Sequence, residues 1–188
     1  MTTNALSASA LDDLAAPWPI TFDDVMRARE RLAPYLVQTP LRPYPLLDEF
    51  LGGGASLLIK HENHQPTCSF KVRNGLSFVT DLPAEERERG IVAASTGNHG
   101  QGIAYAAHLL GSRATICVPA GNNPEKNAAI RAWGATVREE GRDYDEAVDV
   151  MLRLSREHGM HVAHSTYDTR VLAGAATMSL EMFEQSGG

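Results

Sequence analysis

The feature that most constrains the fold is a run of alternating strand and helix patterns between residues 90 and 163. Short apolar segments recur along it, and longer segments with helical periodicity separate them. Proline or glycine marks most of the junctions, as expected where a helix or strand ends. The expected strands are Ile91–Ala94, Ala114–Val118, Ala135–Arg138 and His161–Ala163, and the expected helices are Gln101–Leu110, Pro124–Trp133 and Tyr144–His158. This order predicts an α/β fold in which helices cover a parallel sheet.

The segment before this run has a less regular pattern. Thr21 and Asp24 are spaced to cap a helix, and Phe22, Val25 and Leu32 would share one face of it. Further expected elements are a helix over Leu46–Leu51, a strand over Ser56–Lys60, a helix over Arg73–Thr80 and a linker from Pro83 to Arg89.

Composition narrows the classes of function. The net charge is −6 and no basic stripe is present, which disfavours nucleic acid and anionic membranes as partners. Residues 1–20 contain no lysine or arginine, and no apolar stretch reaches about eighteen residues, so neither a secretory signal nor a transmembrane helix is expected. Cys68 and Cys117 form no disulfide framework, which fits a reducing compartment and a cytoplasmic location.

Two segments carry the chemical signal. Lys71 follows Ser69 and Phe70, and 24 residues later the chain reads Ser95-Thr96-Gly97-Asn98-His99 between an expected strand and an expected helix. A strand, a polar turn and a helix start aim backbone N–H groups at an anion. Each segment alone has an ordinary explanation, since most lysines are surface charges and such a loop can simply cap a helix. Their combination points to a reactive amine beside an anion site.

The two segments resemble the signature motifs of the serine/threonine dehydratase branch of the fold-type II pyridoxal-phosphate enzymes, and the resemblance runs from about Thr21 to the last residue. That family has Pro-Thr-Gly-Ser-Phe-Lys at the first segment and Ser-x-Gly-Asn-His at the second. The resemblance implies the tryptophan synthase β-like fold, with a parallel βαβ small domain and a larger domain, and pyridoxal 5'-phosphate as cofactor. It implies no metal.

The resemblance also assigns roles to residues at matching positions. Lys71 would be the Schiff-base lysine, Phe70 would pack beside the cofactor, and Asn98 would hydrogen-bond the phenolic oxygen of the cofactor. Ser95, Thr96, Gly97 and His99 would form the substrate carboxylate site, and Thr96 could serve as a second acid–base group. Asn63 and Arg73 match motif positions for which the sequence offers no duty.

Two positions depart from the motif. Cys68 and Asn74 stand where the family usually has glycine. Glycine is used where the backbone closely approaches a ligand or takes a positive φ, so we expect the Cys68 side chain to crowd the cofactor. Asparagine tolerates the left-handed conformation better than most residues, which makes Asn74 the milder departure.

The implied reaction explains the residue types. An aldehyde cofactor needs an amine partner, and only lysine offers a nucleophilic amine on a long arm. Removal of the substrate Cα proton by Lys71 requires a lowered pKa. The resemblance implies a small amino-acid substrate, threonine or serine, dehydrated and deaminated to a 2-keto acid and ammonia by a homodimer in a full-length form. The alternatives are a related hydroxylated amino acid, such as a degradation product of a compatible solute, and a non-catalytic domain that keeps the fold.

The length leaves the large domain incomplete. In the family, the next element is a strand ending in a glycine-rich loop that cradles the cofactor phosphate, and a later Ser, Thr or Cys faces the pyridine nitrogen. Neither is present in these 188 residues. We expect either a piece of a longer protein or a chain that has lost the chemistry. The expected division is a flexible tail over 1–20, a large-domain portion over 21–85 and 165–188, and the small domain over 86–164.

Other site interpretations are weaker. Gly97, Gly100 and Gly102 superficially match a dinucleotide fingerprint, but their spacing is reversed and no acidic residue ends the next strand. His158, His161 and His164 recur every third residue across a helix end and a strand, where they would not share a face. Solvated histidines are therefore favoured over a metal site.

Overall fold

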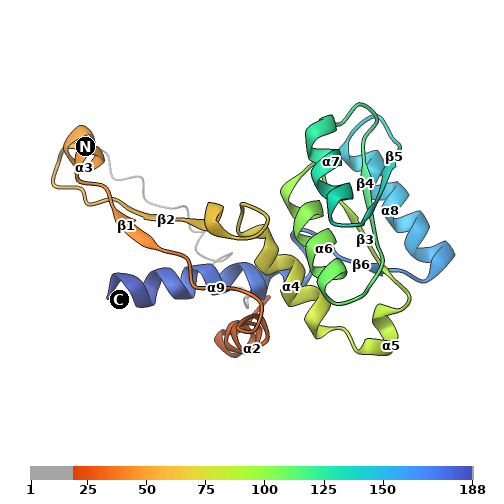
Figure 1. The fold of residues 1–188 in the computed structure, drawn as a ribbon, viewed down its shortest axis with the longest axis horizontal. Coiled ribbons are helices and arrows are strands. Elements are labelled where there is room, and N and C mark those ends of the chain that lie inside the picture. Colours follow the sequence, from red (N-terminus) through yellow and green to blue (C-terminus); the bar gives the residue numbers. More distant parts are fainter. Residues whose placement is uncertain (1–18, 188) are drawn as a thin grey trace, which may run out of the picture.

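The computed structural model describes residues 19–187 and confirms the expected α/β fold. A four-stranded sheet has the order β5-β4-β3-β6, and every pairing in it is parallel. The elements of this part are β3 (Ile91–Ala94), α6 (Asn98–Leu109), β4 (Ala114–Val118), α7 (Pro124–Ala132), β5 (Thr136–Glu139), α8 (Tyr144–His158) and β6 (His161–Val162). Helices α6 and α7 lie on one side of the sheet and α8 on the other (Figure 1).

Alternation along β3 explains the two layers of helices. Ile91 and Ala93 belong to the larger apolar cluster, which contains α6 residues, whereas Val92 and Ala94 belong to a second cluster with α8 residues. Successive side chains of a strand point to opposite faces, so β3 is buried on both sides. A central strand of this kind requires a continuous apolar sequence, and residues 91–94 provide it.

The strand order places a topological switch point between β3 and β6. From β3 the chain moves outward to β4 and β5, and it then returns to the opposite side of β3 as β6. In open parallel sheets, the crevice outside the carboxyl ends of the strands at such a point is the usual binding site. The loops that follow β3 and β6 therefore meet where a ligand is expected.

Helix α4 (Lys71–Asp81) joins this layer to the rest of the chain, because it contacts both α6 and α9 (Thr169–Ser186). Glycines allow these contacts to be very close. A Cβ atom on Gly102 would lie 2.2 Å from the Lys71 carbonyl oxygen, and one on Gly174 would lie 2.5 Å from that of Arg73. Gly102 thus fixes how near the first turn of α4 approaches α6.

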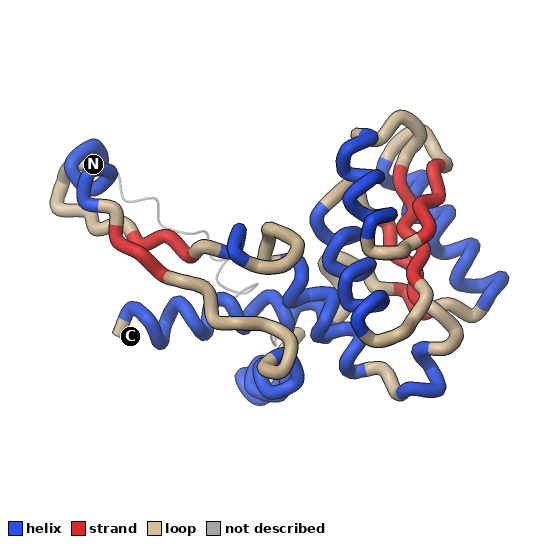
Figure 2. The backbone as a smooth tube through the Cα atoms, viewed as in Figure 1, coloured by secondary structure: helices blue, strands red, loops and turns tan. Residues whose placement is uncertain are grey.

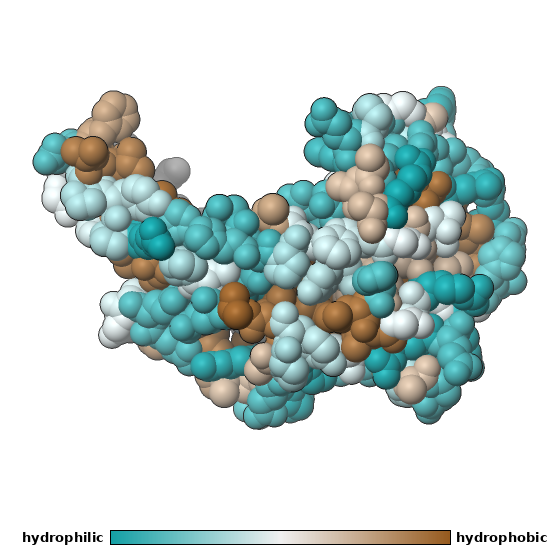
Figure 3. All heavy atoms as spheres, in the orientation of Figure 1, coloured by the Kyte–Doolittle hydropathy of each residue, from teal (hydrophilic) through white to brown (hydrophobic). Residues whose placement is uncertain are grey.

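The remaining elements form an arm and its support (Figures 1 and 2). They are α2 (Phe22–Leu32), β1 (Leu41–Pro43), α3 (Pro45–Leu51), β2 (Leu58–Lys60), the 3-10 turn η1 (Glu62–His64) and α5 (Ala84–Arg87). Strands β1 and β2 pair antiparallel, and α3 lies at the far end of this hairpin. Leu46 and Phe50 of α3 are 80% and 88% exposed, and apolar residues gather there on the surface (Figure 3).

Several expectations needed correction. The capping box at Thr21 and Asp24 is present, but Phe22 is 66% exposed, because it occupies the first helical position and the buried face starts at Val25. The helix predicted from Gln101 begins at Asn98, so the polar loop is shorter than expected. The linker after Pro83 contains α5, and β1 was not predicted at all, since its three residues carry no periodic signal.

Two points of the sequence interpretation stay as they were. The expected tail over residues 1–20 falls almost wholly outside the described residues, and the division into a small and a large domain remains a prediction. Within residues 19–187, no helix is long and apolar enough to span a bilayer. The same residues contain no group of acidic, histidine and cysteine side chains arranged to hold a metal ion.

Candidate functional site

A cavity of about 370 Å³ lies at the carboxyl ends of the strands. Both predicted segments reach it, although they are separate in sequence. Its lining residues are Lys71, Ala94, Ser95, Thr96, Gly97, Asn98, His99, Lys126, Tyr144 and Ser165. Two lysines and one histidine line it, and none of these ten residues is acidic, so the cavity suits an anion.

Lys71 is the first residue of α4 and is partly buried. Within residues 19–187 its ammonium forms no hydrogen bond or ion pair, and it lies 4.8 Å from the centre of the Phe70 ring. Burial lowers the pKa of the Lys71 side chain. The positive end of the helix dipole at the start of α4 acts in the same direction. The predicted reactive amine is therefore biased toward its neutral, nucleophilic form.

The loop after β3 is organised by Ser95. The Ser95 Oγ accepts hydrogen bonds from the backbone N–H groups of Gly97, at 3.1 Å, and Gly100, at 2.9 Å. Gly100 is also fixed by packing, because a Cβ atom there would lie 2.8 Å from Ile116 Cγ2. The Ser95 oxygen is thus engaged in shaping the loop, and its predicted contact with a substrate carboxylate remains untested.

The start of α6 offers donors to the cavity. The backbone N–H groups of Asn98 and His99 belong to its first turn, where no intrahelical acceptor exists. Within the described part of the chain, neither N–H has another hydrogen-bond partner. The Thr96 and Asn98 side chains are exposed at the cavity. Gly97 is the N-cap residue of α6, so these groups face the positive end of the helix dipole.

His99 connects the two sides of the switch point. Its Nε2 lies 3.0 Å from the carbonyl oxygen of Ala163, which follows β6. A carbonyl oxygen only accepts, so Nε2 carries the proton and Nδ1 is left as an acceptor. Burial lowers the pKa of His99 to about 4, which keeps the ring neutral. The imidazole is therefore unsuited to donate to a carboxylate, whereas the His99 backbone N–H can do so.

Three lining residues were missed from the sequence. Lys126 lies in the first turn of α7, Tyr144 begins α8, and Ser165 follows β6. All three come shortly after the carboxyl end of a strand, which is the signal that could have identified them. Phe70, which was expected beside a cofactor, is not one of the residues that line the cavity; it contacts the Lys71 ammonium instead.

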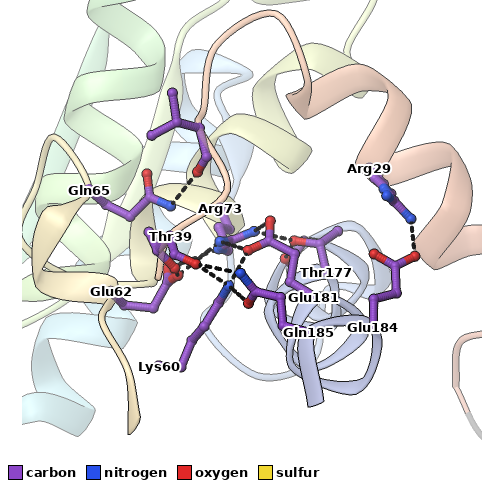
Figure 4. A network of polar contacts seen from close by, with 12 residues as sticks. Arg29, Thr39, Lys60, Glu62, Gln65, Arg73, Thr177, Glu181, Glu184 and Gln185 are labelled. Atoms are coloured by element: carbon purple, nitrogen blue, oxygen red, sulfur yellow. Dashed lines mark hydrogen bonds and ion pairs between the residues drawn. The ribbon is translucent and has the colours of Figure 1, made fainter. Parts of the chain in front are cut away.

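The structure gives the motif residue Arg73 a duty. Its side chain is only 2% exposed and is held by two carboxylates (Figure 4). The Arg73 Nε and Nη2 donate to the two oxygens of Glu62 at 2.8 Å each, and Nη1 and Nη2 donate to those of Glu181 at 2.8 and 2.9 Å. Such bidentate pairs fix orientation as well as charge.

Lys60 completes this network. Its Nζ lies 2.6 Å from Glu181 Oε2, so two cations balance two carboxylates away from water. Thr39 adds a hydrogen bond of 2.6 Å to Glu62 Oε1. The network joins the end of β2 and η1 to α4 and α9, and it therefore anchors the helix whose first residue is Lys71.

The two departures from the motif differ in their backbone. Cys68 is exposed and adopts a φ of 51°, the only positive φ outside glycine in the described chain. A glycine would adopt this conformation freely. Asn74 lies inside α4, where it is 1% exposed and its Oδ1 has no hydrogen-bond partner within residues 19–187. Asn74 therefore does not need the left-handed conformation that its tolerance would have allowed.

Comparison with known proteins places the chain in context. A model of the family described as "Pyridoxal-phosphate dependent enzyme" matches residues 32–188. Among curated proteins, the L-threonine ammonia-lyase of Thermotoga maritima is 39% identical over 165 residues, which are 88% of this chain and 41% of the relative. The catabolic L-threonine dehydratase TdcB of Staphylococcus aureus is 35% identical over 184 residues, or 98% of this chain and 51% of the relative.

Solved structures agree with these matches. A maize serine racemase superposes with a TM-score of 0.85 at 28% identity and covers 90% of this chain, which spans 51% of it. A threonine deaminase from T.th. has a TM-score of 0.80 at 39% identity and covers 89% of this chain, which spans 52% of it. The chain thus spans about half the length of the relatives that it matches.

Proposed function

The chain belongs to the family of pyridoxal-phosphate dependent enzymes, and from that premise we propose that it is part of an ammonia-lyase acting on threonine or serine. The proposed reaction dehydrates and deaminates a small β-hydroxy amino acid to a 2-keto acid and ammonia. The names of the threonine ammonia-lyase and dehydratase relatives support this choice of substrate.

One observation carries the proposal: an unpaired lysine amine and the amino end of a helix open into one cavity. Lys71 has a lowered pKa and no partner within the described chain, and the free N–H groups of Asn98 and His99 lie in the same cavity lining. A cofactor with an aldehyde and anionic groups requires an amine of this kind without a competing carboxylate. The residues present therefore fit pyridoxal phosphate.

The roles of the residues follow from their chemistry. Pyridoxal phosphate, when bound, supplies a ring that takes up the negative charge left by removal of the Cα proton. Lys71 would hold the cofactor and, once its amine is free and neutral, accept that proton. The N–H groups of Asn98 and His99 would hold the substrate carboxylate. The Asn98 side chain would orient the cofactor, and the Thr96 hydroxyl would lie beside the substrate.

Covalent trapping tests the proposal in the 188-residue chain, because it detects even weak binding. The chain is incubated with millimolar pyridoxal phosphate and reduced with borohydride, and the modified lysine is identified by peptide mass spectrometry. We expect modification at Lys71. Lys126 provides an internal control, since it lines the same cavity. Modification at Lys126 and not at Lys71 would refute the assigned role.

Turnover is tested separately. Release of 2-keto acid from threonine and serine is followed in the presence of the cofactor, with the Lys71→Ala variant as the control. Cofactor modification of Lys71 without any keto acid would favour a non-catalytic domain. Release from another hydroxylated amino acid, but not from threonine or serine, would change the substrate and leave the reaction class intact.

Assembly and location are also part of the proposal. We infer a cytoplasmic homodimer for a full-length form. The exposed apolar surface of α3, including Leu46, Phe50 and Leu51, supports association with further protein surface. Light scattering of the Phe50→Lys variant checks this, because loss of the apolar contact should reduce self-association relative to the original chain.

A further inference from the structure

The chain contains three lysines, and the structure gives two of them clear tasks. Lys60 belongs to the buried ion network, where it also donates to the carbonyl oxygen of Thr39 and to Gln185. Lys71 is the proposed reactive amine. Lys126 lies outside both motifs, yet it lines the same cavity as Lys71. Its ammonium has no hydrogen bond or ion pair to any residue between 19 and 187. A cation without a partner in this cavity requires an explanation.

Lys126 is placed by the start of α7. The Asn123 side chain caps this helix by accepting from the N–H groups of Glu125, at 2.9 Å, and Lys126, at 3.2 Å. Asn122 Nδ2 donates to Asn127 Oδ1 at 2.6 Å and reaches the carbonyl oxygen of Thr96 at 3.4 Å. Because Asn127 is 2% exposed, this link is anchored in the fold. The first turn of α7 is therefore tied to the loop that precedes α6.

The Lys126 side chain passes directly over the amino end of α6. A Cβ atom on Gly97 would lie 3.1 Å from Lys126 Cδ and 3.5 Å from its Nζ. Gly97 is the N-cap residue, and the free N–H groups of Asn98 and His99 follow it. The missing side chain at position 97 thus leaves room for the lysine beside the helix donors.

We propose that Lys126 binds the substrate α-carboxylate together with the backbone N–H groups of Asn98 and His99. This inference rests on the proposed function, whose site it completes. Lys71 would be engaged with the cofactor and the Cα proton, so it cannot also neutralise the carboxylate. His99 is neutral and its Nε2 is engaged with Ala163. Lys126 is then the remaining cation in the cavity lining.

The charge of the cavity supports this assignment. No Asp or Glu lines it, so an ammonium at Lys126 is not neutralised from the cavity wall. A carboxylate held by backbone N–H groups at a helix start gains further from a charged donor, since charge-assisted hydrogen bonds are stronger than neutral ones. Lys126 would therefore contribute mainly to binding, and its loss should raise KM far more than it lowers kcat.

The test uses acetate as the probe, because it carries a carboxylate and no amine. The ¹⁵N-labelled chain is titrated with acetate at constant ionic strength, and the amide resonances of Asn98 and His99 are followed by NMR. Four chains are compared: the original, Lys126→Gln, Lys126→Arg and Arg89→Gln. The last removes the same unit charge from an exposed residue just before β3, at the opposite end of the strands.

We expect saturable shifts in the original chain and a dissociation constant about tenfold or more higher in Lys126→Gln, the effect of losing one charge-assisted hydrogen bond. Lys126→Arg should stay within about threefold because it keeps the charge, and Arg89→Gln should match the original. Gly97→Ala offers an independent check, because its methyl group displaces the lysine. It should weaken binding in the original chain and have little effect when Lys126 is already Gln.

The possible failures are distinguishable. Equal acetate binding by the original chain and Lys126→Gln would overturn this inference while leaving the anion site of the proposed function in place. No shift of the Asn98 and His99 resonances in any chain would overturn the anion site and, with it, the proposed function. If Lys126→Gln weakens binding of succinate but not of acetate, the lysine serves a second carboxylate, and the α-carboxylate assignment is wrong.

Discussion

Arg73 and Glu62 form a bidentate ion pair in the interior, with both Glu62 oxygens accepting at 2.8 Å. The two residues stand at opposite ends of the motif that contains Lys71. Burial alone would raise the pKa of Glu62, but hydrogen bonds from Arg73 and Thr39 lower it below its usual value. The motif therefore encodes an anchor for its own lysine as well as the lysine itself.

The first prediction concerns this anchor. Arg73→Met leaves Glu62 and Glu181 with Lys60 as their only cation in the network, and we expect a loss of about 3 to 5 kcal/mol in the free energy of unfolding. Arg73→Lys should recover little, because an ammonium cannot form the two-pronged contacts. The exposed pair of Arg29 and Glu184 is the control, and Arg29→Met should cost less than about 1 kcal/mol. Urea denaturation measures all three, and similar losses for Arg73→Met and Arg29→Met would contradict the anchoring role.

The second prediction is a pH dependence from His99. Its folded-state pKa is about 4 against an ordinary value of 6.5, so the unfolded chain binds a proton more readily than the folded chain. Stability from this group is fully present above pH 6.5 and is lost as the pH falls toward 4, by on the order of 3 kcal/mol. His99→Gln should flatten the profile between these limits. Denaturant midpoints measured across the range check it, and an unchanged profile in His99→Gln would assign the dependence to other groups.

A third prediction concerns the contact between α4 and α6. In Gly102→Ala the new methyl group would meet the Lys71 carbonyl oxygen at 2.2 Å, so the two helices must separate. Overpacking against backbone should cost about 3 kcal/mol or more. Gln101→Ala, one position earlier and partly exposed, should stay within about 0.5 kcal/mol. Thermal unfolding compares the two variants, and equal melting temperatures would mean that the helices are not held at this distance.

The fourth prediction isolates the backbone of Cys68. Its positive φ is unfavourable for any residue with a side chain, and glycine removes this cost but adds freedom to the unfolded chain. Cys68→Gly should therefore stabilise the fold by about 0.5 to 1 kcal/mol. Cys68→Ala keeps the unfavourable conformation and should give no gain. Thermal unfolding of both variants decides, and a gain in Cys68→Ala would locate the effect in the thiol.

The same pair of variants bears on the expectation that Cys68 crowds the cofactor. Tighter pyridoxal-phosphate binding in Cys68→Gly, but not in Cys68→Ala, would trace the effect to backbone conformation. Tighter binding in both would trace it to the size of the side chain.

The sequence alone determined the elements whose signals are local. The strands over residues 91–94 and 114–118 and the helix Tyr144–His158 were predicted with their observed bounds, because apolar runs, proline and glycine act within a few residues. The pairing of the lysine motif with the Ser95–His99 loop also identified the family. Short strands such as β1 and the exposure of Phe22 escaped prediction, since neither has a periodic signal.

The tertiary structure decided which side chains meet. Lys126 and Ser165 reach the cavity because parallel strands end at one edge of the sheet, and the order β5-β4-β3-β6 brings the loops after β3 and β6 together. Arg73 finds Glu181 across 108 residues of chain because Gly174 lets α9 pack directly against α4. Local sequence specifies backbone conformation, whereas the partners of a buried charge depend on which distant surfaces can approach closely enough to exclude water.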